Sequence, residues 1–159
     1  MGLGYRLKLN RGNGGTYWIY NNANKGIPFA GADSNSSVTS GDKGTYLHVL
    51  SYWTGYCFST VAVDLTNYNK LHFRGTYGVT SNSWGRYYFG ITKSVNGDYA
   101  RSTYHQTVNY QTATLSDDID VSDLVGTYYI KFQGADGRRY TEGDTWYQCE
   151  SIVRQIWLD

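Results

Sequence analysis

One phrase occurs twice in this chain, and that repeat constrains the fold more than any other feature of the sequence. Residues 63–75 read VDLTNYNKLHFRG, and residues 119–134 repeat its elements as IDVSDL and, after a short spacer, IKFQG. In each copy an apolar residue precedes Asp, and a hydroxyl residue two positions after the Asp can close a turn. An apolar residue between them fills the corner, and an alternating apolar and polar strand follows and ends at Gly. Two such corners predict a sandwich of two β-sheets.

The composition also indicates an all-β protein of one domain. The 159 residues include 17 Tyr, 5 Trp, 5 Phe and 19 Gly but one Pro, a mixture that favours half-buried pleated surfaces joined by tight turns. This length suits a single domain with its own core, and no segment shows helical periodicity with caps. Residues 21–44 are rich in Asn, Ser, Gly and Ala and predict a long surface loop. We therefore predict an all-β, antiparallel β-sandwich that occupies residues 1–159 as a single domain.

Alternating segments mark the expected strands. Residues 5–9 and 16–20 flank a glycine-rich turn and predict a first hairpin. Residues 45–52 and 86–91 alternate in the same way and predict two further strands. Residues 152–158 predict a last strand that is apolar enough to pair on both sides.

The middle of the chain carries the strongest hairpin signal. Asn96-Gly97 lies between two alternating segments and predicts a tight turn there. Residues 99–115 then predict one long strand or two short ones. We expect Val108, Tyr110 and Leu115 to point inward from this segment.

The charge pattern argues against nucleic-acid and membrane partners. The chain has 14 basic and 13 acidic residues spread along its length, which leaves a formal charge of +1. Such a balance lacks the basic patch that nucleic acid or an anionic membrane requires. No apolar run reaches the length of a membrane span, and the first residues lack a signal-peptide pattern. We expect no nucleic-acid partner and no membrane insertion.

The cysteines and histidines give no sign of catalysis or of zinc. Cys57 and Cys149 stand 92 positions apart, and isolated cysteines of this kind are more often small buried apolar side chains than a disulfide. No Cys/His spacing matches a zinc site. His48, His72 and His105 lie in expected strands, with no nucleophile elbow and no carboxylate at a telling spacing. We interpret them as surface or cross-strand histidines and expect a protein that is not an enzyme.

The paired corners resemble those of galactose-binding-like jelly rolls, a group that includes many carbohydrate-binding modules. More narrowly, residues 63–71, residues 125–132 and the ending Ile156-Trp157-Leu158 resemble domains in tail-fibre, baseplate and other virion surface proteins of phages that infect Gram-positive bacteria. The resemblance covers pieces of roughly the C-terminal two-thirds of the chain. It implies a jelly-roll sandwich in a virion or extracellular setting, with a role in attachment to glycans or in building a virion appendage.

Aspartates near the second corner are candidates for calcium. Jelly rolls of the resembled group often carry this ion, and Asp117, Asp118 and Asp120 offer the hard oxygen ligands that it prefers. Their spacing does not match an EF-hand, and turn formation explains the same aspartates equally well. Calcium is therefore one of two interpretations, and we expect no other cofactor.

Aromatic residues in polar loops are the strongest functional signal. Sugars stack their apolar C–H faces on Trp and Tyr, while short polar and basic side chains bond the sugar hydroxyls. Three expected loops offer this combination, at residues 53–56, 82–86 and 138–146. Packing within a sheet or across strands is the alternative role for each aromatic residue in them. The candidate ligand-binding residues are Trp53, Tyr56, Trp84, Arg86, Arg138 and Tyr140.

Tyrosines on sheet faces can instead make protein–protein contacts. Tyr46, Tyr52, Tyr87 and Tyr128 are candidates for that role. Because virion modules often repeat by symmetry, the resemblance implies a homo-oligomer or contacts with other virion proteins.

We therefore expect a non-enzymatic virion surface or tail-associated module that binds host cell-surface glycans through its loops. A carbohydrate-binding module of a secreted bacterial enzyme is one alternative. A purely structural subunit that forms oligomers is another. The sequence leaves open the sugar, the order of an oligomer and the pairing of Cys57 with Cys149.

Overall fold

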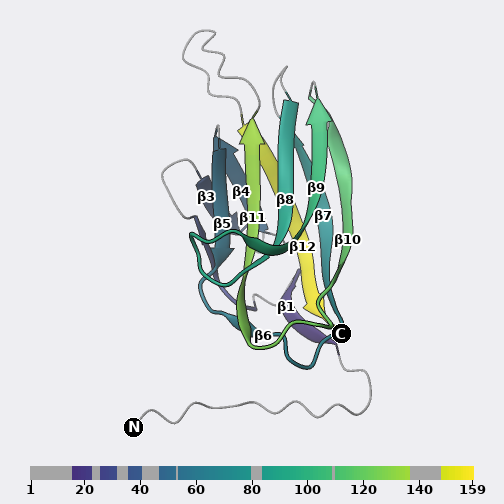
Figure 1. Ribbon diagram of the computed structural model, residues 1–159. Helices are drawn as coiled ribbons and strands as arrows, with labels where there is room; N and C mark the ends of the chain where they lie inside the picture. Colours follow the sequence, from purple (N-terminus) through teal and green to yellow (C-terminus); the bar gives the residue numbers. More distant parts are fainter. Residues whose placement is uncertain are drawn as a thin grey trace.

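The structure, a computed structural model, describes residues 16–22, 26–31, 36–40, 47–52, 54–79, 84–108, 110–136 and 148–159. These residues contain twelve strands arranged in two sheets that pack face to face (Figure 1). In chain order they are β1 (Tyr17–Asn21), β2 (Phe29–Gly31), β3 (Ser36–Ser40), β4 (Leu47–Tyr52), β5 (Thr54–Ser59), β6 (Val63–Asp64), β7 (Lys70–Val79), β8 (Trp84–Thr92), β9 (Tyr99–Val108), β10 (Thr112–Asp120), β11 (Thr127–Asp136) and β12 (Gln148–Leu158).

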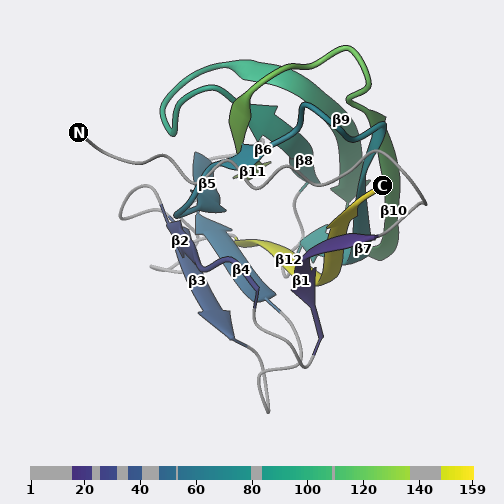
Figure 2. The same ribbon diagram turned by 90° about the horizontal axis from the view of Figure 1, so that it is seen from below.

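All the pairings between these strands are antiparallel. The first sheet has the order β10-β7-β12-β4-β3, and β1 also pairs with β12. The second sheet has the order β2-β5-β11-β8-β9, and β6 also pairs with β11. Figure 2 looks along the strands and shows the two layers. The described residues thus form an antiparallel β-sandwich of jelly-roll type, which confirms the predicted fold class. Among them, no helix is long and apolar enough to span a membrane.

Three phenylalanines join the two sheets at the centre of the core. Phe73 comes from β7 in the first sheet, whereas Phe89 and Phe132 come from β8 and β11 in the second. Their ring centroids lie 5.8 to 5.9 Å apart, and Phe73 meets Phe132 edge to face at 89°. Edge-to-face and tilted contacts of this kind stabilise beyond the area that the rings bury. The core is therefore continuous from one sheet to the other.

Both repeated corners form the predicted turn. Asp64 Oδ1 accepts hydrogen bonds from the amide and the hydroxyl of Thr66, at 3.0 and 2.5 Å. Asp120 Oδ1 accepts the equivalent bonds from Ser122, at 2.9 and 2.7 Å. The aspartate is thus the acceptor in each turn, and the hydroxyl residue reinforces it.

The two corners are also bonded to each other. The apolar residues that fill them, Leu65 and Val121, are fully buried. Gly126 donates its amide proton to Thr66 Oγ1 at 2.9 Å and accepts one from the amide of Leu65 at 3.0 Å. Its φ of 90° lies in the region that favours glycine, so this position closes the second corner against the first.

Other strand predictions are confirmed. The turn at Asn96-Gly97 joins β8 to β9, which pair as a hairpin, and the Gly97 amide donates to Ser94 O at 3.0 Å. Residues 99–115 divide between β9 and β10, one of the two expected arrangements. β12 is central, with β7 on one side and both β4 and β1 on the other. For the predicted first hairpin, residues 5–9 lie outside the described residues, and β1 pairs with β12.

The predicted long loop at residues 21–44 is wrong in part, because β2 and β3 lie within it. β2 pairs with β5, and β3 pairs with β4, so each extends the edge of a sheet. β3 reads SSVTS and has one large apolar residue, Val38, which packs against the core. Pairing with a neighbour, rather than alternation, makes these segments strands.

Two of the three residues expected to point inward from 99–115 do not. Leu115 is fully buried as predicted, but Val108 is 38% exposed and Tyr110 is 66% exposed. On β9 it is Thr107 that points into the sandwich, so Val108 faces the other way. Tyr110 lies between β9 and β10 with a φ of 61°, where the chain reverses outside the core.

Two of the tyrosines assigned to protein contacts are core residues. Tyr87 and Tyr128 are buried, so neither presents a free ring to another protein. The side chains of Tyr46 and Tyr52 lie outside the described residues.

Both cysteines are buried thiols, outside any disulfide, and they belong to different sheets. Cys57 belongs to β5 and Cys149 to β12. Burial raises the pKa of the Cys57 thiol well above its ordinary value. This thiol is therefore protonated at neutral pH and behaves as a small apolar group.

Candidate functional site

The outer face of the second sheet carries a group of aromatic and amide side chains. Tyr87, Phe89 and Ile91 point from β8 into the core, so the alternate residues of β8 must point outward. The antiparallel register then places side chains of β5, β11 and β9 beside them. We call this group the aromatic face, and it consists of Tyr56, Trp84, Arg86, Tyr88, Tyr104, Gln106 and Gln133.

Four of these residues form one row across the sheet. Gln133 pairs with Tyr56 on one side and with Tyr88 on the other, and Tyr88 pairs with Tyr104. Neighbouring strands lie about 4.8 Å apart, so the row extends over roughly 14 Å. It is long enough for a short extended ligand rather than for a single small ring.

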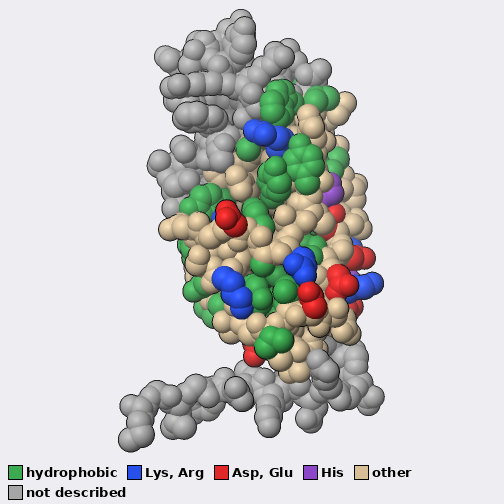
Figure 3. Space-filling model, in the orientation of Figure 1, with side chains coloured by type: hydrophobic (Ala, Val, Ile, Leu, Met, Phe, Trp, Pro, Cys, Tyr) green, Lys and Arg blue, Asp and Glu red, His purple; other side chains and the backbone are tan. Residues whose placement is uncertain are grey.

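The β9 end of the row is open to solvent. Tyr104 is 50% exposed, and its ring centroid lies 5.1 Å from that of Tyr88. The Tyr104 hydroxyl donates to Gln106 Oε1 at 3.4 Å, which leaves the amide NH₂ of Gln106 for another acceptor. Figure 3 shows hydrophobic side chains gathered on the upper part of this face.

A cation adjoins the row. Arg86 and Trp84 lie two positions apart on β8, and the guanidinium carbon sits 4.8 Å from the centroid of the Trp84 ring. The Nε atom of Arg86 is buried and has no hydrogen-bond partner in the part of the chain that the structure describes. Its cross-strand neighbours are Gln106 and Ala135, neither of which carries a charge.

The turn between β8 and β9 covers the other part of the face. Lys131 is 6% exposed and donates to Gly97 O at 3.0 Å, and Tyr56 Oη donates to Asn96 Oδ1 at 2.7 Å. The Lys131 ammonium also lies 4.4 Å from the Tyr56 ring centroid and 5.1 Å from that of Tyr99. Burial lowers the pKa of Lys131, although the charge of nearby Asp98 acts in the opposite direction. The segment that leads into β9 accordingly crosses in front of β11 in Figure 1.

The structure brings three of the six predicted ligand-binding residues together. Tyr56, Trp84 and Arg86 share the aromatic face, whereas Trp53, Arg138 and Tyr140 lie outside the described residues. The ends of β4, β5, β11 and β12 that border the segments containing Trp53, Arg138 and Tyr140 lie at the same end of the sandwich. This follows from the register, since Thr54 faces Ala135, Gly85 faces Asp136, and Cys149 faces both Ser51 and Val79.

The aromatic face also contains residues that the sequence prediction missed. Tyr88, Tyr104, Gln106 and Gln133 lie within strands, and the prediction searched for sugar contacts in loops. One signal was present in the adjacent pair Tyr87-Tyr88, because two consecutive strand residues point to opposite faces and only one can enter the core.

The three aspartates proposed for calcium do not converge. Asp117 points inward, where its Oδ2 lies 2.7 Å from His105 Nε2, while Asp118 and Asp120 point outward. Asp118 Oδ1 lies 2.6 Å from His72 Nδ1 and 2.7 Å from an Arg74 nitrogen, and Asp120 is held in its turn. In the part of the chain that the structure describes, no three His, Cys, Asp or Glu side chains form a group that could hold a metal.

Arg74 and His72 hold the pKa of Asp118 below its ordinary value. Asp118 is therefore ionised at neutral pH and engaged with protein partners on β7. These contacts, rather than a shared ion, account for its place on the sheet surface.

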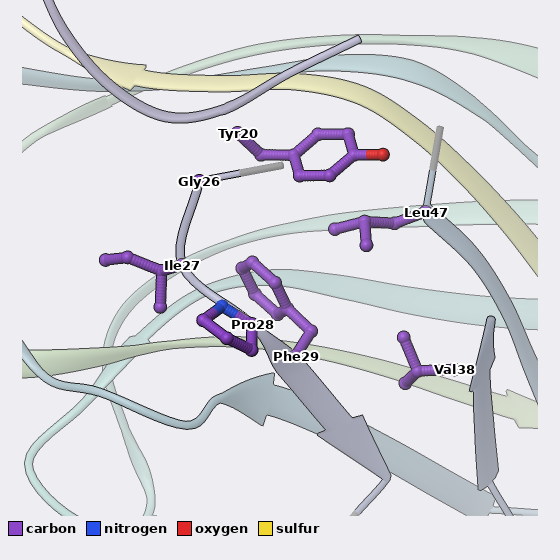
Figure 4. Close-up of a pocket in the computed structure, with 7 residues that line it drawn as sticks. All are labelled: Tyr20, Gly26, Ile27, Pro28, Phe29, Val38 and Leu47. Atoms are coloured by element: carbon purple, nitrogen blue, oxygen red, sulfur yellow. The ribbon is translucent and has the colours of Figure 1, made fainter. Parts of the chain in front are cut away.

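A pocket of about 260 Å³ lies elsewhere, beside β1, β3 and β4 (Figure 4). Tyr20, Phe29, Val38 and Leu47 are among the residues that line it. The Tyr20 hydroxyl is buried and has no hydrogen-bond partner among the described residues, and burial raises its pKa. This apolar lining lacks the convergent polar groups of a sugar site.

The fold is similar to that of solved carbohydrate-active proteins. A carbohydrate-binding module specific for non-crystalline cellulose, CBM28, superimposes with a TM-score of 0.51 at 7% identity, over 82% of this chain and 86% of that chain. An agarase, AgWH50C, superimposes with a TM-score of 0.57 at 8% identity, over 92% of this chain but only 25% of the agarase. No protein-family model and no curated protein matches this chain. At these identities the likeness establishes the fold, a β-sandwich of the kind that carbohydrate-binding modules adopt.

Proposed function

We propose that this chain is a non-enzymatic glycan-binding module and that the aromatic face holds the sugar chain. The observation that carries the proposal is the row of Tyr56, Gln133, Tyr88 and Tyr104 across four strands. Tyrosine rings supply surfaces on which sugar C–H faces stack, and the amide supplies both a donor and an acceptor for hydroxyl groups. A rigid sheet presents these groups in a fixed arrangement, which lowers the entropy lost on binding.

The similar structures support this choice of ligand. CBM28 is a binding module specific for non-crystalline cellulose, and AgWH50C is an agarase, so both proteins recognise polysaccharides. The tyrosine row is an independent reason, because it rests on residues of this chain. An extended surface of aromatic and amide side chains also fits binding better than hydrolysis.

The proposal predicts that the exposed part of the row dominates the affinity. In a glycan array the intact chain is expected to bind at least one polysaccharide. Tyr88→Ala and Tyr104→Ala should each weaken that binding by roughly tenfold or more, since each removes a ring on which a sugar stacks. Isothermal titration with the polysaccharide identified on the array measures the change.

Tyr17→Ala is the matched control, because Tyr17 is a partly exposed tyrosine of β1 in the other sheet. It should leave the affinity unchanged. Binding to no glycan on the array, or equal affinities for Tyr104→Ala and the intact chain, would contradict the proposed site. Incubation with the bound polysaccharide should release no new reducing ends.

Two settings for such a module remain proposals. The resemblance of the corner phrases supports a surface or tail-associated part of a phage virion, assembled as a homo-oligomer or with other virion proteins. The similarity to a carbohydrate-binding module and to an agarase supports a module of a secreted enzyme equally well. Both settings are extracellular. Mass spectrometry of purified virions, together with the molar mass from light scattering, distinguishes them.

A further inference from the structure

Building on the glycan-binding function proposed above, we infer that the sugar chain is acidic and that Arg86 binds its carboxylate. The inference concerns the chemistry of the ligand, which the fold does not specify. It rests on the partners of Arg86, its position beside the tyrosine row and the charges on the face.

Arg86 differs from Arg74 and Arg101 in having no anionic partner among the described residues. Arg74 pairs with Asp118 at 2.7 Å, and Arg101 pairs with Asp123 at 2.6 Å. Among the described residues no carboxylate pairs with Arg86, and its buried Nε has no acceptor. A half-buried guanidinium without an anion is costly unless a ligand supplies one.

The guanidinium is nevertheless held in place. Its contact with the Trp84 ring at 4.8 Å fixes the group on the outer side of β8, two residues from Tyr88 in the row. A sugar stacked on Tyr88 and Tyr104 therefore lies beside this cation. The partial burial of Arg86 lowers the local dielectric and strengthens its attraction for an anion.

The charges on the face favour the same sign of ligand. The buried Lys131 ammonium donates to the Gly97 carbonyl and lies near Asp98, so the cation available to a ligand beside the row is Arg86. In Figure 3 a basic side chain lies among hydrophobic ones in the upper part of the face, whereas acidic and basic side chains lie together lower down. An acidic sugar meets complementary charge there, while a neutral sugar covers the cation without neutralising it.

A carboxylate fits this site better than a sulfate ester does. The planar guanidinium presents paired N–H groups that can bond two oxygens of a carboxylate or of a sulfate ester. A carboxylate is the more basic of the two anions and therefore the stronger acceptor of these hydrogen bonds. The structure thus points to a uronic acid or another sugar acid as the residue bound beside Trp84.

The test compares charged polysaccharides with neutral forms of the same backbone. Polygalacturonate, alginate and hyaluronan are each titrated beside a carboxyl-reduced derivative, and κ-carrageenan is titrated beside its desulfated form. The intact chain should bind at least one carboxylated polymer about tenfold or more tightly than its reduced derivative. That preference should shrink as the salt concentration rises, because the ion pair is screened.

Two substitutions of Arg86 connect the preference to this residue. Arg86→Gln should abolish the difference between the charged and the reduced polymer, whereas Arg86→Lys should retain part of it because the charge remains and the paired geometry does not. Arg101→Gln, which removes an arginine at another exposed position, should leave the preference intact. Thermal unfolding shows that each variant is folded.

The outcomes separate this inference from the proposed function. A carboxylate preference lost in Arg86→Gln supports the inference. Equal affinity for charged and neutral forms, with binding still lost in Tyr104→Ala, overturns it and leaves the glycan-binding function standing. Stronger, Arg86-dependent binding to κ-carrageenan overturns the carboxylate in favour of sulfate. Binding to none of the polymers, charged or neutral, overturns the inference, and binding to no glycan on the wider array overturns the function.

Discussion

At the scale of single residues, Thr66 connects the two corners through its hydroxyl. Its hydroxyl donates to Asp64 in the first corner and accepts the Gly126 amide proton from the second. Ser122 occupies the equivalent position in the second corner, and its hydroxyl bonds to Asp120. The two corners are therefore similar in sequence but differ in their hydrogen bonds, since the Thr66 hydroxyl bonds to residues of both corners.

Thr66→Val should lower the free energy of unfolding by about 2 kcal/mol, because it keeps the shape of the side chain but leaves the Gly126 amide without an acceptor. Ser122→Ala should cost about 1 kcal/mol, since it removes a hydroxyl that serves one turn. Urea unfolding of both variants measures the difference. Equal losses would show that the bond between the corners does not contribute.

Single residues also explain why the site was only partly predicted. Trp84 and Arg86 stand near a polar turn, where local composition indicates sugar contacts. Tyr104 belongs to a strand with few large apolar residues, and its partner Tyr88 is known only once the β8–β9 register is known. Register depends on contacts between segments, which local composition does not report.

At the scale of elements, a polar network holds three strands of the first sheet together. Asp118 of β10 contacts His72 and Arg74 of β7, and the other ring nitrogen of His72 lies 3.0 Å from Asp159 Oδ2, at the end of β12. The His72 ring stacks on Trp157 of β12, with centroids 4.5 Å apart. His72 was expected to be a surface or cross-strand residue, and the structure shows the cross-strand form, buried beneath these partners.

The lowered pKa of Asp118 predicts a pH-dependent contribution to stability. A carboxylate whose pKa is lower in the folded state stabilises the fold above its unfolded pKa of about 3.9, and this contribution is lost as the pH falls through the folded value. Asp118→Asn should therefore destabilise at pH 7, by less than about 1 kcal/mol because the pair is half exposed. The deficit should shrink in acid, at a pH below the lowered folded value, where Asp118 is protonated and carries no charge.

Urea unfolding of the intact chain and Asp118→Asn at the two pH values tests this. Asp123→Asn is the control, since it removes a carboxylate from an exposed pair with Arg101. It should change stability little at either pH. A deficit for Asp118→Asn that is constant down to the acidic value would contradict the assignment.

Elements differ in how far the sequence predicts them. β7, β8 and β12 alternate or are continuously apolar, and their positions follow from that pattern. β2 and β3 do not, because short edge strands need few apolar residues of their own and form by pairing with β5 and β4. The error at residues 21–44 is therefore one of tertiary pairing, which no local pattern records.

For the whole molecule, stability depends on the contact between the sheets. Phe73→Ala should lower the free energy of unfolding by about 3 to 5 kcal/mol, because it opens a cavity among rings from both sheets. Val61→Ala, at a residue that is 56% exposed, should change it by no more than about 0.5 kcal/mol. Equilibrium denaturation measures both. A loss below about 1 kcal/mol for Phe73→Ala would mean that the sheets are held together elsewhere.

The fold class was predictable because each of the two corners is formed by residues that are close together in the sequence. Each turn is formed by an aspartate and a hydroxyl residue two positions apart, so the sequence alone locates it. The aromatic face is different in kind, since its row draws one residue from each of four strands. The sequence shows that these residues are present, but which of them lie side by side depends on how the strands pair.

The central position of β12 has a consequence for how the protein is made. β7, β4 and β1 all pair with β12, yet β12 follows each of them in the chain. The neighbours of this strand therefore leave the ribosome well before the strand itself, and the first sheet cannot close until β12 has emerged. Until then the β7 and β4 edges that pair with β12 lack their hydrogen-bond partners in the nascent chain, where they are available to chaperones and to wrong strand partners.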